Sequence, residues 1–130
     1  MSLLHCGDCR PIQPNPFLPL EEKVDLIILD PPYLTTNKSW DREEVVTIDL
    51  ARSLFESAKD SASLYVWCGI GEKSQSLIRW FPVFARPSAQ QWHFKDLITW
   101  KKQQGLGTRK GWFYTREEIM WFVKDNRKFV

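Results

Sequence analysis

The sequence contains few of the residues that build disulfide frameworks or metal centres. It has three cysteines and two histidines in 130 residues. A small, odd number of cysteines argues against a disulfide framework. Cys6 and Cys9 form a C-x-x-C, but no second pair completes the four ligands that zinc usually takes. We therefore predict neither a metal site nor redox chemistry.

Long apolar runs are also missing, and no stretch approaches the length that crosses a membrane. The first ten residues have no basic region followed by an apolar core. This predicts no signal peptide, no membrane partner and a cytoplasmic location. A chain of 130 residues that is 43% hydrophobic and 26% charged has the size and composition of one soluble globular domain.

The net charge is only +2, but it is distributed unevenly. Residues 1–85 contain 8 Lys and Arg against 12 Asp and Glu, whereas residues 86–130 contain 10 against 4. A basic carboxyl-terminal third with interleaved aromatic residues suits nucleic acid. A solvated surface without a partner explains the charge alone equally well.

Hydrophobic periodicity predicts alternating strands and helices. Residues 24–29 are mostly branched aliphatic, the pattern of a strand buried on both faces of a parallel sheet. Asp41 is a candidate cap for the first helix, and Pro82 is expected to end the second. The expected elements are strands at residues 24–29 and 63–68 and helices at residues 42–59 and 72–81. This alternation predicts an α/β fold with helices packed on the sheet.

The two ends of the chain follow a different pattern. Residues 3–6 form a further strand candidate, and a proline-rich connector follows them. Residues 97–100 and 118–123 read as strands joined by a polar loop at residues 103–115. Two strands without an intervening helix are most simply an antiparallel pair. We therefore expect a mixed sheet.

The motif Asp30-Pro31-Pro32-Tyr33 follows the first buried strand. In open parallel sheets, ligands bind beyond the carboxyl ends of the strands. The two prolines have a fixed φ and no amide hydrogen, so the turn is rigid. A carboxylate beside an outward carbonyl offers two acceptors for a primary amine, and Tyr33 can stack on a planar ring. The motif is therefore suited to hold an exocyclic amino group; the alternative is that the prolines only end the strand.

This motif, in its place after a hydrophobic strand, resembles the catalytic motif of S-adenosylmethionine-dependent amino methyltransferases that act on DNA. Other segments are similar to the permuted group of these enzymes, in which the catalytic half precedes the cofactor half. These segments are residues 5–9, 40–41, 64–68, 100–102 and 118–124. The resemblance implies a partial Rossmann-like methyltransferase fold, with a mixed sheet and helices on its faces.

The resemblance also implies roles for individual residues. Asp30 and the Pro31 carbonyl would accept both hydrogens of a target amine, in a base flipped out of double-stranded DNA. Tyr33 would stack on that base, with Trp40 and Phe113 as further base-binding candidates. The implied catalytic residues are Asp30, Pro31, Pro32 and Tyr33. The implied contacts of the S-adenosylmethionine cofactor are Asp8 and Asp30; the alternative for Asp8 is a turn residue after Gly7. Independently of the resemblance, five cations surround the glycine-containing loop and are candidates for DNA phosphate: Lys101, Lys102, Arg109, Lys110 and Arg116. A solvated hairpin tip explains them equally well.

Aspartate in the first motif position implies N6-adenine rather than N4-cytosine as the target, and the resemblance associates the chain with restriction–modification. The glycine-rich cofactor loop of the family is missing from the 130 residues. We therefore expect one domain, residues 1–130, that is the truncated or partial catalytic portion of a methyltransferase. A homodimer or a complementing cofactor-binding half would complete it. A catalytically inactive relative that binds nucleic acid or pairs with another subunit is the alternative.

Overall fold

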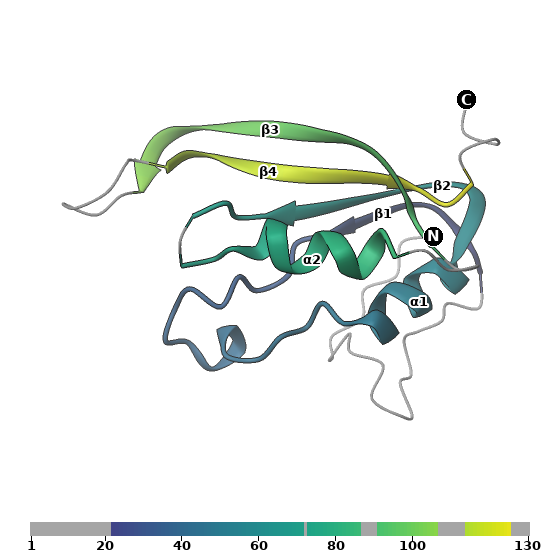
Figure 1. Cartoon of the computed structure of the whole chain (residues 1–130), viewed down its shortest axis with the longest axis horizontal. Helices are drawn as coiled ribbons and strands as arrows, with labels where there is room; N and C mark the ends of the chain where they lie inside the picture. The colour runs from purple at the N-terminus through teal and green to yellow at the C-terminus, as the bar shows by residue number, and fades with distance from the viewer. Residues whose placement is uncertain (1–21, 72, 87–90, 107–113, 126–130) are drawn as a thin grey trace.

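The computed structural model describes residues 22–71, 73–86, 91–106 and 114–125, and Figure 1 shows their arrangement. The strand expected at residues 3–6 lies outside these ranges. Four strands form one sheet in the order β1-β2-β4-β3. They are β1 (Val24–Leu29), β2 (Ala58–Cys68), β3 (His93–Leu106) and β4 (Tyr114–Val123). The pairing of β1 with β2 is parallel and the other pairings are antiparallel, which confirms the mixed α/β sheet.

Two α-helices, α1 (Ile48–Ser57) and α2 (Ser76–Phe84), lie on the same face of the sheet (Figure 1). Alternate residues of β2 are fully buried and form the centre of the core, among them Leu64 and Val66. Leu50 of α1 and Trp80 of α2 are equally buried. Every second side chain of β2 therefore packs against the apolar side of the two helices.

Helix α1 begins six residues later than its apolar pattern predicted. Thr47 is its N-cap, and the Thr47 side chain accepts a hydrogen bond from the amide of Leu50 at 3.2 Å. The helix ends at Ser57 because β2 begins at the next residue. The expectation that Asp41 caps this helix is wrong: Asp41 closes a separate 3-10 turn, Ser39–Asp41.

Helix α2 also differs from the expectation, because it continues through Pro82 to Phe84. Proline in a helix interior removes one i→i−4 hydrogen bond. Here it lies near the end of a nine-residue helix and on the exposed side. The amide of Ala85 still bonds to the carbonyl of Phe81 at 3.0 Å, so the last turn closes without the amide that proline lacks.

Strands β3 and β4 are longer than their apolar cores indicated. Their ladder extends to Trp100 opposite Glu117 and Lys101 opposite Arg116, and resumes at Leu106 opposite Tyr114. The sequence pattern placed Leu106 and Tyr114 in the polar loop at residues 103–115, and it left Lys101, Arg116 and Glu117 outside the predicted strands. The pair projects beyond the rest of the sheet as one long hairpin (Figure 1).

The expectation that β1 is buried on both faces is wrong. Ile27 and Leu29 pack against the core, but Leu26 and Ile28, which point to the other face, are 52% and 61% exposed. No described helix covers that second face, which we call the open face. Tyr65 and Trp121 stack on it at 5.9 Å with their rings 7° apart. Within the described ranges, neither helix has the length and apolarity needed to cross a membrane.

Candidate functional site

A hollow of about 270 Å³ lies at the carboxyl end of β1. Its lining, which defines what we call the motif hollow, consists of Asp30, Pro31, Pro32, Tyr33, Thr35, Thr36, Trp40 and Asp41. The structure thus brings all four motif residues to one surface depression, together with Trp40. Their catalytic and base-binding roles stay predictions.

Asp30 and Tyr33 are linked at this hollow. The Asp30 side chain is exposed and accepts a 3.3 Å hydrogen bond from the Tyr33 hydroxyl. Burial, and then the charge of Asp30, raise the pKa of Tyr33 above its ordinary value, so the hydroxyl keeps its proton and acts as a donor. An ionised carboxylate has about four acceptor positions. One long bond therefore leaves Asp30 able to accept hydrogens from a ligand.

The ring of Tyr33 already has a packing partner. It lies 5.8 Å from the Trp80 ring of α2, at an interplanar angle of 58°. Trp40, in contrast, is 66% exposed where it lines the motif hollow. Of these aromatic rings, Trp40 therefore offers the larger bare surface to a planar ligand.

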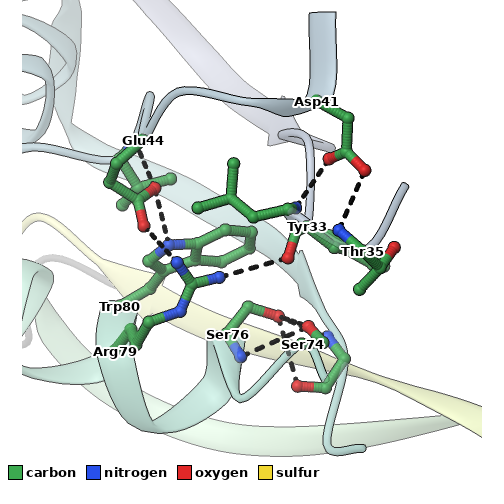
Figure 2. Close-up of polar contacts among 11 residues, drawn as sticks. Tyr33, Thr35, Asp41, Glu44, Ser74, Ser76, Arg79 and Trp80 are labelled. Atoms are coloured by element: carbon green, nitrogen blue, oxygen red, sulfur yellow. Dashed lines mark hydrogen bonds and ion pairs between the residues drawn. The ribbon is translucent and has the colours of Figure 1, made fainter. Parts of the chain in front are cut away.

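Asp41 is a buried carboxylate, 3% exposed, that holds the loop after the motif. Its oxygens accept hydrogen bonds from the amide of Thr35 at 2.9 Å (Figure 2) and from the amides of Leu34 and Thr36, each at 2.6 Å. Burial alone would raise the pKa of Asp41, but hydrogen bonds from the Thr36 side chain and from the three amides hold it below the ordinary 3.8. The sequence did not predict this function of Asp41; the only local signal was an aspartate a few residues beyond a turn.

A second set of contacts ties the motif to α2 (Figure 2). Arg79 donates to the carbonyl oxygen of Tyr33 at 3.3 Å and forms an ion pair with Glu44 at 2.6 Å. The other Glu44 oxygen accepts from the Trp80 indole nitrogen at 2.9 Å. Sequence reasoning missed these three residues, because Glu44 and Arg79 lie 35 positions apart.

The turn after β2 is held beside the motif by two buried hydroxyl groups. The Ser76 hydroxyl accepts from the Gly69 amide at 2.7 Å and lies 2.6 Å from the Ser74 hydroxyl. A Cβ atom on Gly69 would lie 2.6 Å from the Ser74 oxygen. Only glycine fits this close approach without a shift of the serine.

The described cations of the β3–β4 hairpin are only partly available to a ligand. Lys101 is exposed. Lys102 forms an ion pair with Glu117, and Arg116 forms one with the buried Glu118 at 3.0 Å. Four other predicted site residues lie outside the described ranges: Asp8, Arg109, Lys110 and Phe113.

Other chemistry has little support in the described residues. Burial, with the charge of Glu118 adding to it, raises the pKa of Cys68 to about 12, so this thiol stays protonated and is a poor nucleophile. Within the described ranges, His, Cys, Asp and Glu form no group of three or more that could hold a metal ion. The Cys6–Cys9 pair is outside those ranges.

Comparisons with known proteins agree on one family and one fold. A model of the N6/N4 methyltransferase family, described as DNA methylase, matches residues 24–130. The Type II methyltransferase M.HpaI of Haemophilus parainfluenzae is 25% identical over 118 residues, which are 85% of this chain and 36% of that protein.

Two solved structures share the fold. The structure of M1.HpyAVI in complex with SAM superposes with a TM-score of 0.56 at 18% identity, covering 84% of this chain and 48% of that one. A structure of M1.HpyAVI gives a TM-score of 0.54 at 20% identity, covering 80% and 46%. The chain therefore spans less than half the length of these relatives and shares the fold of the part that it matches.

Proposed function

This chain belongs to the DNA methylase family, and from that premise we propose that it is the catalytic portion of an S-adenosylmethionine-dependent adenine DNA methyltransferase. The observation that carries the proposal is the position of Asp30. Its carboxylate is exposed, it comes directly after β1 and before two prolines, and it lines the motif hollow. An amine that enters the hollow would meet an acceptor held on a rigid turn.

The proposed role of the motif is to orient the target amine. The Asp30 carboxylate and the Pro31 carbonyl would each accept one amine hydrogen, which directs the nitrogen lone pair toward the methyl donor. The reaction is an in-line displacement, so alignment of the reacting atoms contributes more than acid–base chemistry. The new N–C bond would form as the bond between the cofactor's sulfur and its methyl group breaks, leaving a neutral thioether, and the surplus amine proton would then pass to water.

S-adenosylmethionine, when bound, supplies an electrophilic methyl group on a positively charged sulfur. The described residues fit this group in part: Asp30 offers a negative charge at the hollow. A hollow of about 270 Å³ lies below the usual range for drug-sized ligands, so it has room for a base rather than for base and cofactor together. The remaining cofactor contacts, Asp8 among them, would come from outside the hollow.

Double-stranded DNA is the proposed substrate, with the target base flipped into the motif hollow. Trp40 would stack on that base. Among the three predicted cations that the structure describes, Lys101 has the clearest access to phosphate. Lys102 and Arg116 would first have to exchange their carboxylate partners for phosphate. A cytosine target and a non-catalytic, DNA-binding relative are the alternatives that the experiment below separates.

A second polypeptide segment or a second copy is proposed to complete the fold. M.HpaI aligns with this chain over only 36% of its length. In the described residues, β1 is an end strand of the sheet, and strand edges pair readily with another chain. The apolar side chains of Leu26 and Ile28 beside that edge suit a docked cofactor-binding half or homodimer.

Transfer of a labelled methyl group from S-adenosylmethionine to unmethylated DNA tests this function, with the methylated nucleosides identified by mass spectrometry. We expect N6-methyladenine, and a loss on the order of a hundredfold in rate with Asp30→Ala, because the amine is no longer aligned. Asp49→Ala is the matched control, since Asp49 is an exposed acid of α1 paired with Arg52.

Three outcomes contradict parts of the proposal. N4-methylcytosine as the product would replace adenine with cytosine as the target. DNA binding without any methyl transfer, unchanged by Asp30→Ala, would support the non-catalytic relative. Transfer that survives Asp30→Ala at full rate would remove Asp30 from the mechanism.

A further inference from the structure

The loop between the motif and the 3-10 turn depends on few apolar contacts. Residues 35–40 are all exposed, so burial contributes little to the loop's conformation. Leu34 has a φ of 60°, in the left-handed region that is unfavourable for a non-glycine residue. Some other interaction has to hold this conformation.

Asp41 provides that interaction. Its two oxygens gather three consecutive amides, those of residues 34–36, within 2.6–2.9 Å. Hydrogen bonds to a charged acceptor are stronger than neutral ones, and this acceptor is buried, which limits competition from water. The strained Leu34 lies at one end of the set, so the carboxylate holds the backbone where it turns.

The same loop carries Trp40. Trp40 precedes Asp41 within the 3-10 turn, whose backbone is closed by a 3.0 Å bond from the Asp41 amide to the Lys38 carbonyl. The Asp41 side chain and main chain thus connect the turn that carries Trp40 to the segment that leaves the motif. Trp40, 66% exposed, lines the motif hollow together with Asp30.

We propose that Asp41 is a positioning residue for the target base: its carboxylate holds the loop so that the Trp40 indole forms an aromatic wall of the motif hollow. The proposal rests on the proposed function, since it takes the hollow to receive an adenine. Asp41 itself is engaged by three backbone amides and acts through Trp40. Asp30 holds the amine, and the Trp40 wall, fixed by Asp41, holds the plane of the base.

A double-mutant cycle on the full chain tests this division of roles, with deoxyadenosine as the probe and ligand-observed NMR as the measurement. We expect Asp41→Asn to weaken deoxyadenosine binding by about tenfold, because the wall is no longer fixed. In a Trp40→Ala background, the same substitution should change affinity by less than about twofold, since two residues that act as a unit are not additive. Asp49→Asn, which removes the same charge from an exposed position, should leave affinity unchanged.

Hydrogen exchange of the amides of residues 34–36 supplies a second readout. These amides should be protected in the wild type and exchange faster in Asp41→Asn, with the protection of β2 retained. Equal exchange in both proteins would contradict the proposal that the Asp41 carboxylate holds these amides. Equal weakening of binding in the wild-type and Trp40→Ala backgrounds would show a general structural effect and would also overturn the proposal, with the proposed function intact. If the wild type neither binds deoxyadenosine nor methylates DNA, the proposed function fails and this inference fails with it.

Discussion

Two aspartates at the motif hollow carry the same charge but have different surroundings. Asp30 is exposed and accepts one long bond, from Tyr33. Asp41 is buried and accepts three bonds from backbone amides. Because Asp30 is open to solvent, it can bind a ligand at little cost. Displacement of Asp41, in contrast, would leave three amides without an acceptor. Hydrogen bonding and burial therefore distinguish a group that can contact a ligand from a group that holds the scaffold.

The lowered pKa of Asp41 predicts a pH dependence of stability. A carboxyl group whose pKa is lower in the folded than in the unfolded state stabilises the fold above the unfolded value, and this contribution is lost as pH falls through the folded pKa. The free energy of unfolding of the wild type should therefore exceed that of Asp41→Asn by a constant amount from neutral pH down to about pH 4, near the ordinary value of 3.8. Below that pH the difference should shrink.

Urea denaturation of both proteins at a series of pH values measures this difference. Asp49→Asn controls for the loss of one negative charge, because its side chain is 73% exposed. A difference that stays constant to pH 2, or one that grows as pH falls, would contradict a lowered pKa of Asp41 in the folded state.

At the scale of the elements, the start of α1 decides how long the loop after the motif is. The apolar pattern allowed a helix from residue 42, but Thr47 caps it five residues further on. Residues 42–47 are thereby left outside the helix, and Glu44 in this segment reaches Arg79 and Trp80 of α2. If the helix began at residue 42, Glu44 and Val46 would have helical backbone conformations. Glu44 could then not keep its contacts with Arg79 and Trp80.

Thr47→Ala should lower the free energy of unfolding by about 1 kcal/mol, the usual loss when an N-cap hydroxyl is removed. The physical reason is that the Leu50 amide loses its 3.2 Å acceptor. Thr47→Ser keeps the hydroxyl and should retain most of the stability in the same urea titration. If the serine variant is as unstable as the alanine variant, the threonine methyl group rather than the cap is responsible.

At the scale of the whole molecule, the sheet is covered unequally. Both described helices protect one face, and the open face presents apolar side chains from β1 and β3. Leu26 and Ile28 of β1, with Ile98 and Trp100 of β3, are each at least 40% exposed. Exposed apolar area of this extent marks an interaction surface or an aggregation-prone one. The distribution fits a sheet that is one portion of a larger fold.

The pair Leu26→Glu and Ile28→Glu should therefore reduce concentration-dependent self-association in analytical ultracentrifugation, because two charges at the β1 edge oppose docking on that face. The matched control is Ile78→Glu, since Ile78 is even more exposed but lies on α2, on the other side of the sheet. Association that persists in the double variant, or that only Ile78→Glu abolishes, would place the interface elsewhere.

The sequence predicted the features that depend on neighbouring residues. The motif turn follows directly from Asp30, two prolines and the apolar residues of β1, and the parallel and antiparallel parts of the sheet follow from the presence or absence of a helix between strands. The family could also be predicted from the sequence, because its most specific signal is one contiguous motif, residues 30–33. The boundaries of α1, α2 and the hairpin were less accessible, because capping and cross-strand pairing set them.

What the sequence determined by itself is the chemistry at the end of β1: a carboxylate, a rigid turn and aromatic rings, whose order along the chain fixes their proximity. Only the tertiary structure decided which of these groups remain accessible. Asp41 holds the loop because the amides of residues 34–36 fold back onto its carboxylate. The Tyr33 carbonyl accepts a hydrogen bond from Arg79 of α2, 46 positions away. Local sequence specifies the identity of a group, whereas its exposure depends on which distant segments pack against it.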